Sequence, residues 1–319
     1  MVQFGCSVPS SGSLTDPRSL TRIATEAEML GFDYVTVSDH IIIPTDIASR
    51  YPYTESGEFP SGAFVDRHEQ LTEATWVAAK TSRIRIVTSV MVVPHRPAVL
   101  TAKILASLDV LSGGRLTLGI GAGWLAEEFA AVGTPPFAER GAVTDEYMMA
   151  CKALWEQDSP TFHGKYTQFS GVAFLPKPIQ KPIPIWIGGE SGPAMRRTAR
   201  YGNAWYPIGT NPQFPMDTLT RYKAGIAKLR GIAEKAGRDP AEIALAYRVS
   251  SNPEAQPKGT VYGERKLFTG GAADHVGDIR SLVELGVTAF DFGLFGPDLQ
   301  STLDNMRRFQ EEIARKVRG

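Results

Sequence analysis

An acid and an imidazole are neighbours at Asp39 and His40, directly after an apolar run that begins at Tyr34. An imidazole titrates near neutral pH, and a histidine at the carboxyl end of a buried strand is well placed to move a proton. We therefore predict that Asp39 and His40 are catalytic residues, with His40 transferring the proton. A histidine that only packs is the competing interpretation.

The remaining histidines and the cysteines give weaker signals. His95 follows the third apolar run and is predicted to line the same pocket. Surface positions are predicted for the other three, His68, His163 and His275. No spacing among the histidines matches a metal site. Cys6 and Cys151 are too few and too far apart for a disulfide framework or a metal pair, so they are predicted to be structural thiols.

A glycine-rich segment, GGRLTLGIGAGW, runs from Gly113 to Trp124. It combines a turn, a short apolar run of strand length and small residues where the strand would end. The end of the segment, Ala122-Gly123-Trp124, either packs closely or leaves room for a flat ligand. Glu127 and Glu128 follow one helical turn later, where a carboxylate either compensates the helix dipole or supplies an acid.

A second segment of small residues predicts an anion site. Gly188-Gly189 ends the apolar run PIWIG, and Glu190-Ser191 opens the following helix. Free backbone N–H groups and the positive end of a helix bind anions. We predict that Gly188, Gly189, Glu190 and Ser191 bind the phosphate of a cofactor, with Glu190 pointing away from it. The alternative is that Ser191 only caps the helix.

The charge balance limits the class of partner. The 34 basic and 34 acidic side chains cancel, so neither nucleic acid nor an anionic membrane is favoured, and a small-molecule substrate fits better. No stretch reaches the ~18 apolar residues of a membrane span, and the first residues contain no apolar signal core, so we expect a cytoplasmic protein. Solvated loop charges, rather than a second phosphate site, are predicted for Arg248, Lys258, Arg265 and Lys266.

Eight short apolar runs recur along the 319 residues and must position these side chains. They begin at Phe4, Tyr34, Ile84, Leu116, Pro184, Ala204, Ile243 and Ala289. Strands that read as nearly continuous apolar runs are buried on both faces, as parallel strands are, and eight βα units close a barrel. The predicted fold class is α/β, a (β/α)8 TIM barrel with insertion loops that forms a single domain over residues 1–319.

Helical periodicity falls between these runs. The predicted helices cover residues 20–30, 70–79, 99–111, 142–155, 196–200, 219–236, 279–285 and 299–317. Three excursions are too long for ordinary connections. Residues 41–67 and 252–271 follow strands two and seven and should border the active face, 41–67 as a lid or pocket wall. Residues 158–181 precede strand five and are predicted to be a peripheral extension.

Four motifs that span nearly the whole chain carry a resemblance to a known family. They are SDH at 38–40, TSVMVVPHRPAVLTAK at 88–103, LDVLSGGRLTLGIGAGW at 108–124 and PIWIGGESGPAMRRTARYGNAW at 184–205. In this order and spacing they resemble the bacterial luciferase-like superfamily, and within it the branch of oxidoreductases that use the deazaflavin coenzyme F420. Relatives of this type that bind FMN make FMN the alternative cofactor.

The resemblance implies a role for several positions. Asp39 would lie beside the deazaflavin ring and His40 near the reacting carbon. Ser89-Val90 would form a bulge with a cis peptide bond behind the ring, and Ala122-Gly123-Trp124 would border the ring. The resemblance also implies a homodimer.

The predicted function is hydride transfer between F420 and a small organic substrate, with the cofactor supplying the redox chemistry. One rival is an FMNH2-dependent monooxygenase, which oxygen consumption would distinguish. Another is a non-catalytic flavin- or deazaflavin-binding protein, which would bind cofactor tightly without turnover. A cofactor-free hydrolase is disfavoured, because the sequence offers no plausible metal cluster or nucleophile-base pair.

Overall fold

The computed structural model describes residues 2–249 and 258–319, and within them parallel strands close into a barrel. In barrel order the strands are β1 (Gln3–Ser7), β2 (Tyr34–Val37), β3 (Arg85–Thr88), β5 (Leu116–Gly121), β8 (Ile185–Gly188), β9 (Ala204–Tyr206), β10 (Ala244–Val249) and β13 (Val287–Phe292). Each pairs in parallel with the next, and β13 returns to β1. The predicted (β/α)8 barrel is confirmed.

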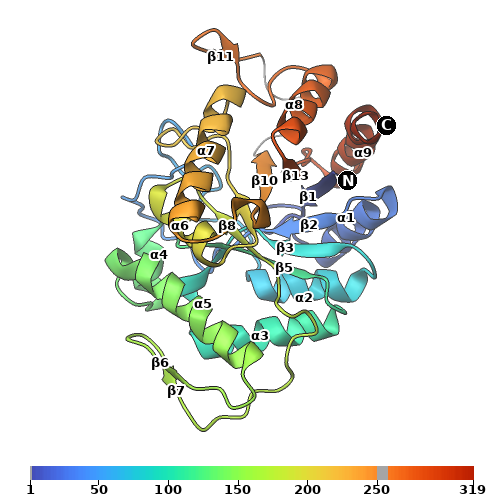
Figure 1. Ribbon diagram of the computed structural model, residues 1–319. Coiled ribbons are helices and arrows are strands. Elements are labelled where there is room, and N and C mark those ends of the chain that lie inside the picture. Colours follow the sequence, from blue (N-terminus) through green and yellow to red (C-terminus); the bar gives the residue numbers. More distant parts are fainter. Residues whose placement is uncertain (1, 250–257) are drawn as a thin grey trace.

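The helices surround the barrel as an outer ring (Figure 1). They are α1 (Pro17–Leu30), α2 (Gln70–Lys80), α3 (Ala98–Leu111), α5 (Arg140–Glu156), α6 (Gly192–Tyr201), α7 (Leu219–Lys235), α8 (Ala272–Glu284) and α9 (Leu299–Phe309). α9 continues through a π-helical turn (Gln310–Ala314) into α10 (Arg315–Arg318). Helix α8 begins earlier than its predicted apolar range, because Ala and Asp in its first turn give no apolar period. Helix α6 begins at Gly192, directly after the predicted opening at Glu190-Ser191.

Short elements fill the connections. The helix α4 (Ala126–Val132) lies outside the predicted helix ranges, although Glu127 and Glu128 are interpreted above as a pair at a helix start. Short 3-10 turns occur at η1 (Val93–His95), η2 (Phe137–Glu139) and η3 (Pro240–Glu242). The third apolar run divides into β3 and a two-residue strand, β4 (Met91–Val92), which pairs with β5. The break between β3 and β4 is the Ser89–Val90 step, where the backbone leaves the regular ladder.

Helix α1 shows how local sequence sets an element. Asp16 caps it by accepting from the N–H groups of Arg18 and Ser19, and Gly31 ends it in the left-handed region at φ 81°. Both signals are typical of helix ends. The predicted apolar face is buried against the barrel at Leu20, Ile23, Ala24 and Ala27. Burial of a large aliphatic side chain stabilises the fold by about 1.5–3 kcal/mol.

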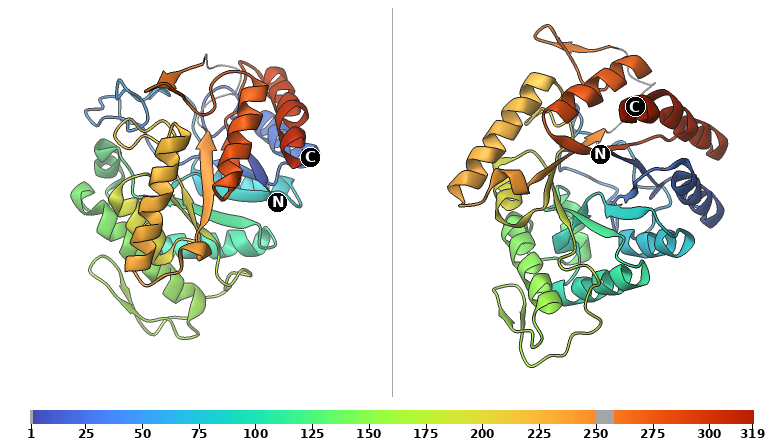
Figure 2. Two further views of the ribbon diagram at one scale, coloured as in Figure 1. Left: turned by 45° about the horizontal axis from the view of Figure 1, so that its top comes forward. Right: turned by 45° about the vertical axis from the view of Figure 1, so that its right-hand side comes forward.

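The insertions lie at different places on the barrel. Residues 158–181 contain the hairpin β6 (Phe162–His163) and β7 (Gln168–Phe169), which lies outside α3 and α5 in each view (Figures 1 and 2). This confirms the predicted peripheral extension. The insertion predicted at 252–271 falls partly outside the described residues, and its described part contains the hairpin β11 (Thr260–Val261) and β12 (Glu264–Arg265). Among the described residues no helix has the length and apolar character to cross a membrane.

Candidate active site

His40 forms a buried polar pair with Glu128 at the mouth of the barrel. The Nδ1 atom of His40 lies 2.8 Å from Oε2 of Glu128, although the two residues are 88 positions apart. Glu128 belongs to α4, and its Oε1 accepts from the N–H groups of Ile41 and Ile42 at 2.7 and 3.3 Å. These contacts fix the backbone after β2 and the imidazole together.

The ionisation of Glu128 determines where the imidazole carries its proton. Burial opposes the charged form, but the hydrogen bond from His40, the imidazole charges of His40 and His95, and the N–H of Ile41 outweigh it and lower the pKa of Glu128. A carboxylate only accepts hydrogen bonds, so Nδ1 of His40 donates to it. The Nε2 atom of a neutral His40 is then the bare nitrogen.

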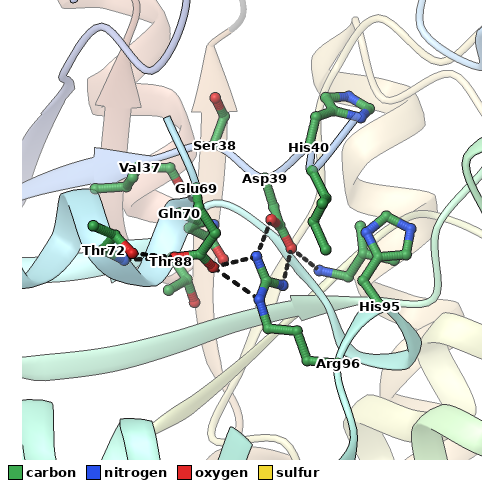
Figure 3. A network of polar contacts seen from close by, with 12 residues as sticks. Val37, Ser38, Asp39, His40, Glu69, Gln70, Thr72, Thr88, His95 and Arg96 are labelled. Atoms are coloured by element: carbon green, nitrogen blue, oxygen red, sulfur yellow. Dashed lines mark hydrogen bonds and ion pairs between the residues drawn. The ribbon is translucent and has the colours of Figure 1, made fainter. Parts of the chain in front are cut away.

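Asp39 points to different partners from its neighbour. Its two carboxylate oxygens accept from the guanidinium of Arg96 at 2.8 and 2.9 Å, and one of them also accepts from Val92 N–H at 2.8 Å (Figure 3). Arg96 also binds Glu69, which caps α2. The side chain of Asp39 therefore connects the end of β2 to β4 and α2.

Aromatic rings from the 41–67 segment cover His40. The ring of Phe59 lies 5.2 Å from the imidazole, and Trp124 lies 6.2 Å from it, between centroids. Tyr51 contacts both Phe59 and Trp124, at 5.3 and 5.1 Å. The imidazole is only 14% exposed, so this cluster limits the access of water to the His40–Glu128 pair.

The Ser89–Val90 peptide bond is cis, as predicted. Glycines make room for this bulge. A Cβ at Gly119 would lie 2.0 Å from the carbonyl oxygen of Thr88, and Cβ atoms at Gly121 and Gly188 would lie 2.8 and 2.9 Å from the side chain of Val90. The small residues of β5 and β8 thus accommodate the bulge, and Val90 itself is only partly buried at the mouth.

A hydrogen-bonded network supports the bulge from the other side. Burial raises the pKa of Tyr206, so its hydroxyl stays protonated and donates to Asp291 at 2.5 Å. The hydroxyl of Ser89 lies 2.9 Å from that of Tyr206, and Arg248 donates to Ser89 and, at 3.0 Å, to Asp291. Thr36 donates to the same aspartate at 3.3 Å. The network joins β2, β9, β10 and β13 to the bulge.

The predicted anion site lies at the start of α6. Ser191 caps the helix by accepting from Ala194 N–H at 3.4 Å, and Gly189 has φ 101°, where a side chain is strained. Glu190 is 1% exposed and accepts from Ile208 N–H at 2.7 Å and from Asn211 at 2.8 Å. Both oxygens of the Glu190 carboxylate thus bind the loop after β9, so its negative charge is directed away from the N–H groups at the start of α6.

The rest of the glycine-rich end is closely packed. A Cβ at Gly123 would lie 2.6 Å from the ring of Phe129 and 2.8 Å from Val92, and its carbonyl accepts from Arg140 at 3.1 Å. Ala122, like Trp124, is partly buried at the mouth. Of the two adjacent glutamates, Glu127 caps a different part of the loop, accepting from the N–H groups of Ala48 and Ser49 at 2.8 and 3.0 Å.

Two minor predictions fail. His275 is fully buried rather than on the surface, because its Nδ1 lies 2.7 Å from the carbonyl of Gly271 and its ring packs near Phe268. Arg248 is not a solvated loop charge, because β10 carries it into the mouth against Asp291. Lys258 and Arg265, from the last insertion, form ion pairs with Asp274 and Asp278 of α8.

A pocket of about 440 Å³ opens at the carboxyl ends of β9 and β10. Tyr53 from the 41–67 segment lines it, as do Asn211, Tyr247 and Arg248. Lys266 and its neighbours, from the described part of the last insertion, form another wall. The 41–67 segment is therefore a pocket wall, as predicted. Among the described residues there is no cluster of three side chains able to hold a metal ion.

Glu128 and Arg96 are the residues whose importance the sequence understates. Glu128 was considered only as one of two alternatives beside Glu127, and the helix that presents it is too short to show a period. Arg96 follows His95 in a segment with no chemical signature of its own. Both contact Asp39 or His40 across more than 50 positions of sequence, so no local pattern identifies them.

Comparisons with known proteins place the chain in a family. Residues 2–254 match the family model described as luciferase-like monooxygenase. An uncharacterised protein of Mycobacterium tuberculosis (strain ATCC 25618 / H37Rv) is 33% identical over 311 residues, which cover 96% of this chain and 98% of that protein. The FMNH2-dependent dimethylsulfone monooxygenase of Pseudomonas putida is 30% identical over 230 residues, 69% of this chain and 63% of that protein.

A solved structure shows the same fold over the whole chain. The F420-dependent secondary alcohol dehydrogenase in complex with an F420-acetone adduct superposes with a TM-score of 0.76 at 21% identity, covering 100% of this chain and 99% of that one. Identity at this level bears on the fold alone.

Proposed function

The chain belongs to the luciferase-like monooxygenase family, and from this premise we propose that it transfers a hydride between coenzyme F420 and a small organic substrate. The observation that carries the proposal is the His40–Glu128 pair, which leaves one imidazole nitrogen bare at the barrel mouth. Oxidation of an alcohol or reduction of a carbonyl needs a group that takes or gives a proton beside the hydride path. The likeness in fold to an F420-dependent alcohol dehydrogenase supports the same choice.

The residues at the mouth fit a flat cofactor with a phosphate. Val90 would support one face of the ring, and Ala122-Gly123-Trp124 would border it. The phosphate would take N–H groups at the start of α6, where Glu190 is turned into the protein and Gly189 carries no side chain. When bound, the deazaflavin supplies the ring carbon that accepts or donates the hydride.

The chain's own residues would then divide the work. Nε2 of His40 takes a proton from the substrate oxygen in one direction and returns it in the other. Glu128 keeps the other nitrogen protonated and the ring oriented. We assign Asp39 a positioning role through Arg96, because its carboxylate oxygens are both engaged. The aromatic cover of Tyr51 and Phe59 would exclude water from the reacting atoms.

A side-by-side titration of the purified protein with F420 and FMN tests the cofactor. We expect F420 to bind at least about tenfold more tightly, which corresponds to ~1.4 kcal/mol. Equal affinities, or a preference for FMN, would contradict the proposal. We also expect a homodimer. The mass of the purified protein in solution tests this, and a monomeric mass would refute it.

A second candidate is an FMNH2-dependent monooxygenase. The sequence likeness to a dimethylsulfone monooxygenase favours it, since that relative is 30% identical. Oxygen uptake with reduced FMN and candidate substrates separates the two activities, because hydride transfer with F420 consumes no oxygen. Tight binding of either cofactor without turnover would leave a non-catalytic binding protein.

A further inference from the structure

A second imidazole lies beside Glu128. His95 ends the turn η1, and its side chain is 1% exposed. Its Nε2 atom lies 4.0 Å from Oε2 of Glu128, the same oxygen that lies 2.8 Å from Nδ1 of His40. Neither ring nitrogen of His95 has a hydrogen-bond partner within the described residues. One carboxylate oxygen thus faces two imidazoles, one bonded and one just out of reach.

Packing alone does not account for a histidine at this place. The ring of His95 lies edge-on to Phe129, with centroids 4.9 Å apart. A phenyl ring would fill that space without burying two unpaired nitrogens, and an unpaired buried polar group costs about 1–3 kcal/mol. The distance to Glu128 exceeds a hydrogen bond by about 1 Å, which a small rotation of the ring or one bridging water closes.

The surrounding charges decide what His95 can donate to. Burial lowers the pKa of His95, so the neutral ring carries a single N–H at neutral pH. The charged or titratable groups that face it are Glu128 from α4, Asp39 and His40 from the segment after β2, and Arg96 from its own segment. Asp39 is engaged by Arg96, which leaves Glu128 as the available acceptor.

We propose that His95 is a positioning residue that directs its Nε2–H to Glu128 and so keeps the carboxylate an acceptor toward His40; this rests on the proposed role of His40. With two imidazole donors on Oε2, Glu128 stays deprotonated throughout turnover. His40 then keeps its proton on Nδ1 and presents a bare Nε2 to the substrate. Without His95, Glu128 takes up a proton from solvent more readily and donates it to Nδ1, and the neutral imidazole then carries its own proton on Nε2, the reacting nitrogen.

Two substitutions separate donation from packing. His95→Phe keeps a ring against Phe129 and removes both nitrogens, whereas His95→Gln keeps an amide donor near the position of Nε2. The ¹⁵N chemical shifts of the His40 ring report its tautomer in the cofactor-free, full-length protein. The His40 signals are assigned as those that are missing from the spectrum of His40→Gln. We expect the ratio of the two His40 tautomers to change at least about fivefold in His95→Phe, as the loss of one hydrogen bond predicts, and to stay near the wild type in His95→Gln.

Kinetics supply the second readout. In His95→Phe, kcat should fall about tenfold with KM and cofactor affinity within about twofold, and His95→Gln should restore most of the loss. Wild-type tautomer and kcat in a folded His95→Phe protein would overturn the proposal and leave His95 a packing residue. If His95→Phe melts early, His95→Leu takes its place. The tautomer is read without cofactor, so a protein that turns over nothing in the cofactor assays still tests His95 separately from the proposed function.

Discussion

Two polar clusters at the barrel mouth differ in how completely their groups are paired. On the side of β2 and α4, His40 and His95 both face one oxygen of Glu128, and neither nitrogen of His95 has a hydrogen-bond partner in the part of the chain that the structure describes. On the side of β9, β10 and β13, Asp291 accepts from three side chains and Tyr206 joins it to the Ser89 bulge. In the second cluster each of these side chains is hydrogen-bonded to another, whereas in the first the described residues offer His95 no hydrogen-bond partner.

The difference separates two tasks that polar residues perform in one barrel. A network in which every side chain is bonded to its neighbours holds a backbone shape, because moving one member breaks bonds to the others. A cluster with a bare nitrogen retains a group that can exchange a proton. Asp39 and His40 show the same contrast within two adjacent residues, one fully engaged and one with a nitrogen left over.

The largest loss of turnover should follow from removing the imidazole of His40, whose Nε2 atom is the bare nitrogen. His40→Ala should lower turnover about 100-fold or more, since general acid–base catalysis contributes about 10²–10⁴ in rate. Cofactor affinity should stay within a few-fold, because no proton transfer is needed for binding. Steady-state kinetics and a binding titration measure the two quantities. A collapse of affinity with normal turnover at saturation would reverse the assigned role.

The neighbouring glutamates offer a matched pair. Glu128→Gln removes the anion that holds the His40 tautomer and should lower kcat by about 10- to 100-fold. Glu127→Gln, one residue away on the same helix, changes only a loop cap and should leave kcat within about twofold. Equal losses in the two variants would show that the helix, rather than the His40–Glu128 pair, is what matters.

The anion site is tested by Gly189→Val, which places bulk at the start of α6. Affinity for the complete cofactor should fall about 10- to 100-fold, as expected when several N–H groups lose a phosphate. A cofactor fragment without the phosphate should bind the wild type and the variant alike. Gly189→Ala has the same positive φ with a smaller side chain, and it separates backbone strain from bulk. An equal loss of affinity for the complete cofactor and for the fragment would show that the phosphate binds elsewhere.

A substitution in the cluster around Asp291 should change the stability of the protein more than its turnover. Tyr206→Phe removes a hydroxyl that joins Ser89 to Asp291 and should lower the free energy of unfolding by about 1–2 kcal/mol, seen as a lower melting temperature. Turnover should fall much less than in Glu128→Gln. A variant with unchanged melting temperature and a large loss of turnover would place Tyr206 among the reacting groups and erase the contrast between the clusters.

The smallest effect on turnover is expected for Glu73, a buried carboxyl behind β2, whose substitution should change stability instead. Burial raises the pKa of Glu73 from 4.5 to about 8, and its Oε2 has no partner among the described residues. The folded protein therefore keeps a proton that the unfolded chain releases between these values, so stability falls as pH rises from about 4.5 to 8. Glu73→Gln cannot ionise, so its advantage in stability over the wild type should grow by about 4 kcal/mol between pH 4 and pH 8, because each unit of pKa shift corresponds to about 1.4 kcal/mol.

Denaturant unfolding at several pH values measures this difference. The two proteins should be close in stability near pH 4, where the wild-type carboxyl is protonated in both states. Parallel curves across the whole pH range would contradict the assignment of Glu73.

The sequence predicts the barrel because its strands and most of its helices have local signals, namely apolar runs and helical periodicity, that extend over a few residues. Asp39-His40 and the start of α6 are recognisable in the same way, as short motifs after strands, whereas the cis step at Ser89 is implied by the family resemblance. The sequence predicts either Glu127 or Glu128 as an acid or as a helix-dipole partner, and does not indicate that Glu128 binds His40, because the rotation of α4 is set by packing. Arg248 was misread because its partner Asp291 lies 43 positions away on another strand.

Two adjacent glutamates of α4 hold successive stretches of the segment 41–67. Glu128 fixes its first residues beside His40, and Glu127 fixes the chain again at Ala48 and Ser49. Residues 50–66, which carry the rings facing the pocket and the imidazole, lie beyond both anchors. A chimaera that exchanges only residues 50–66 with a relative would acquire a new wall for its substrate and keep its proton-transfer geometry. Under the proposed function, an exchange of this loop would change the substrate wall and the aromatic cover while Glu128 and His40 keep their places.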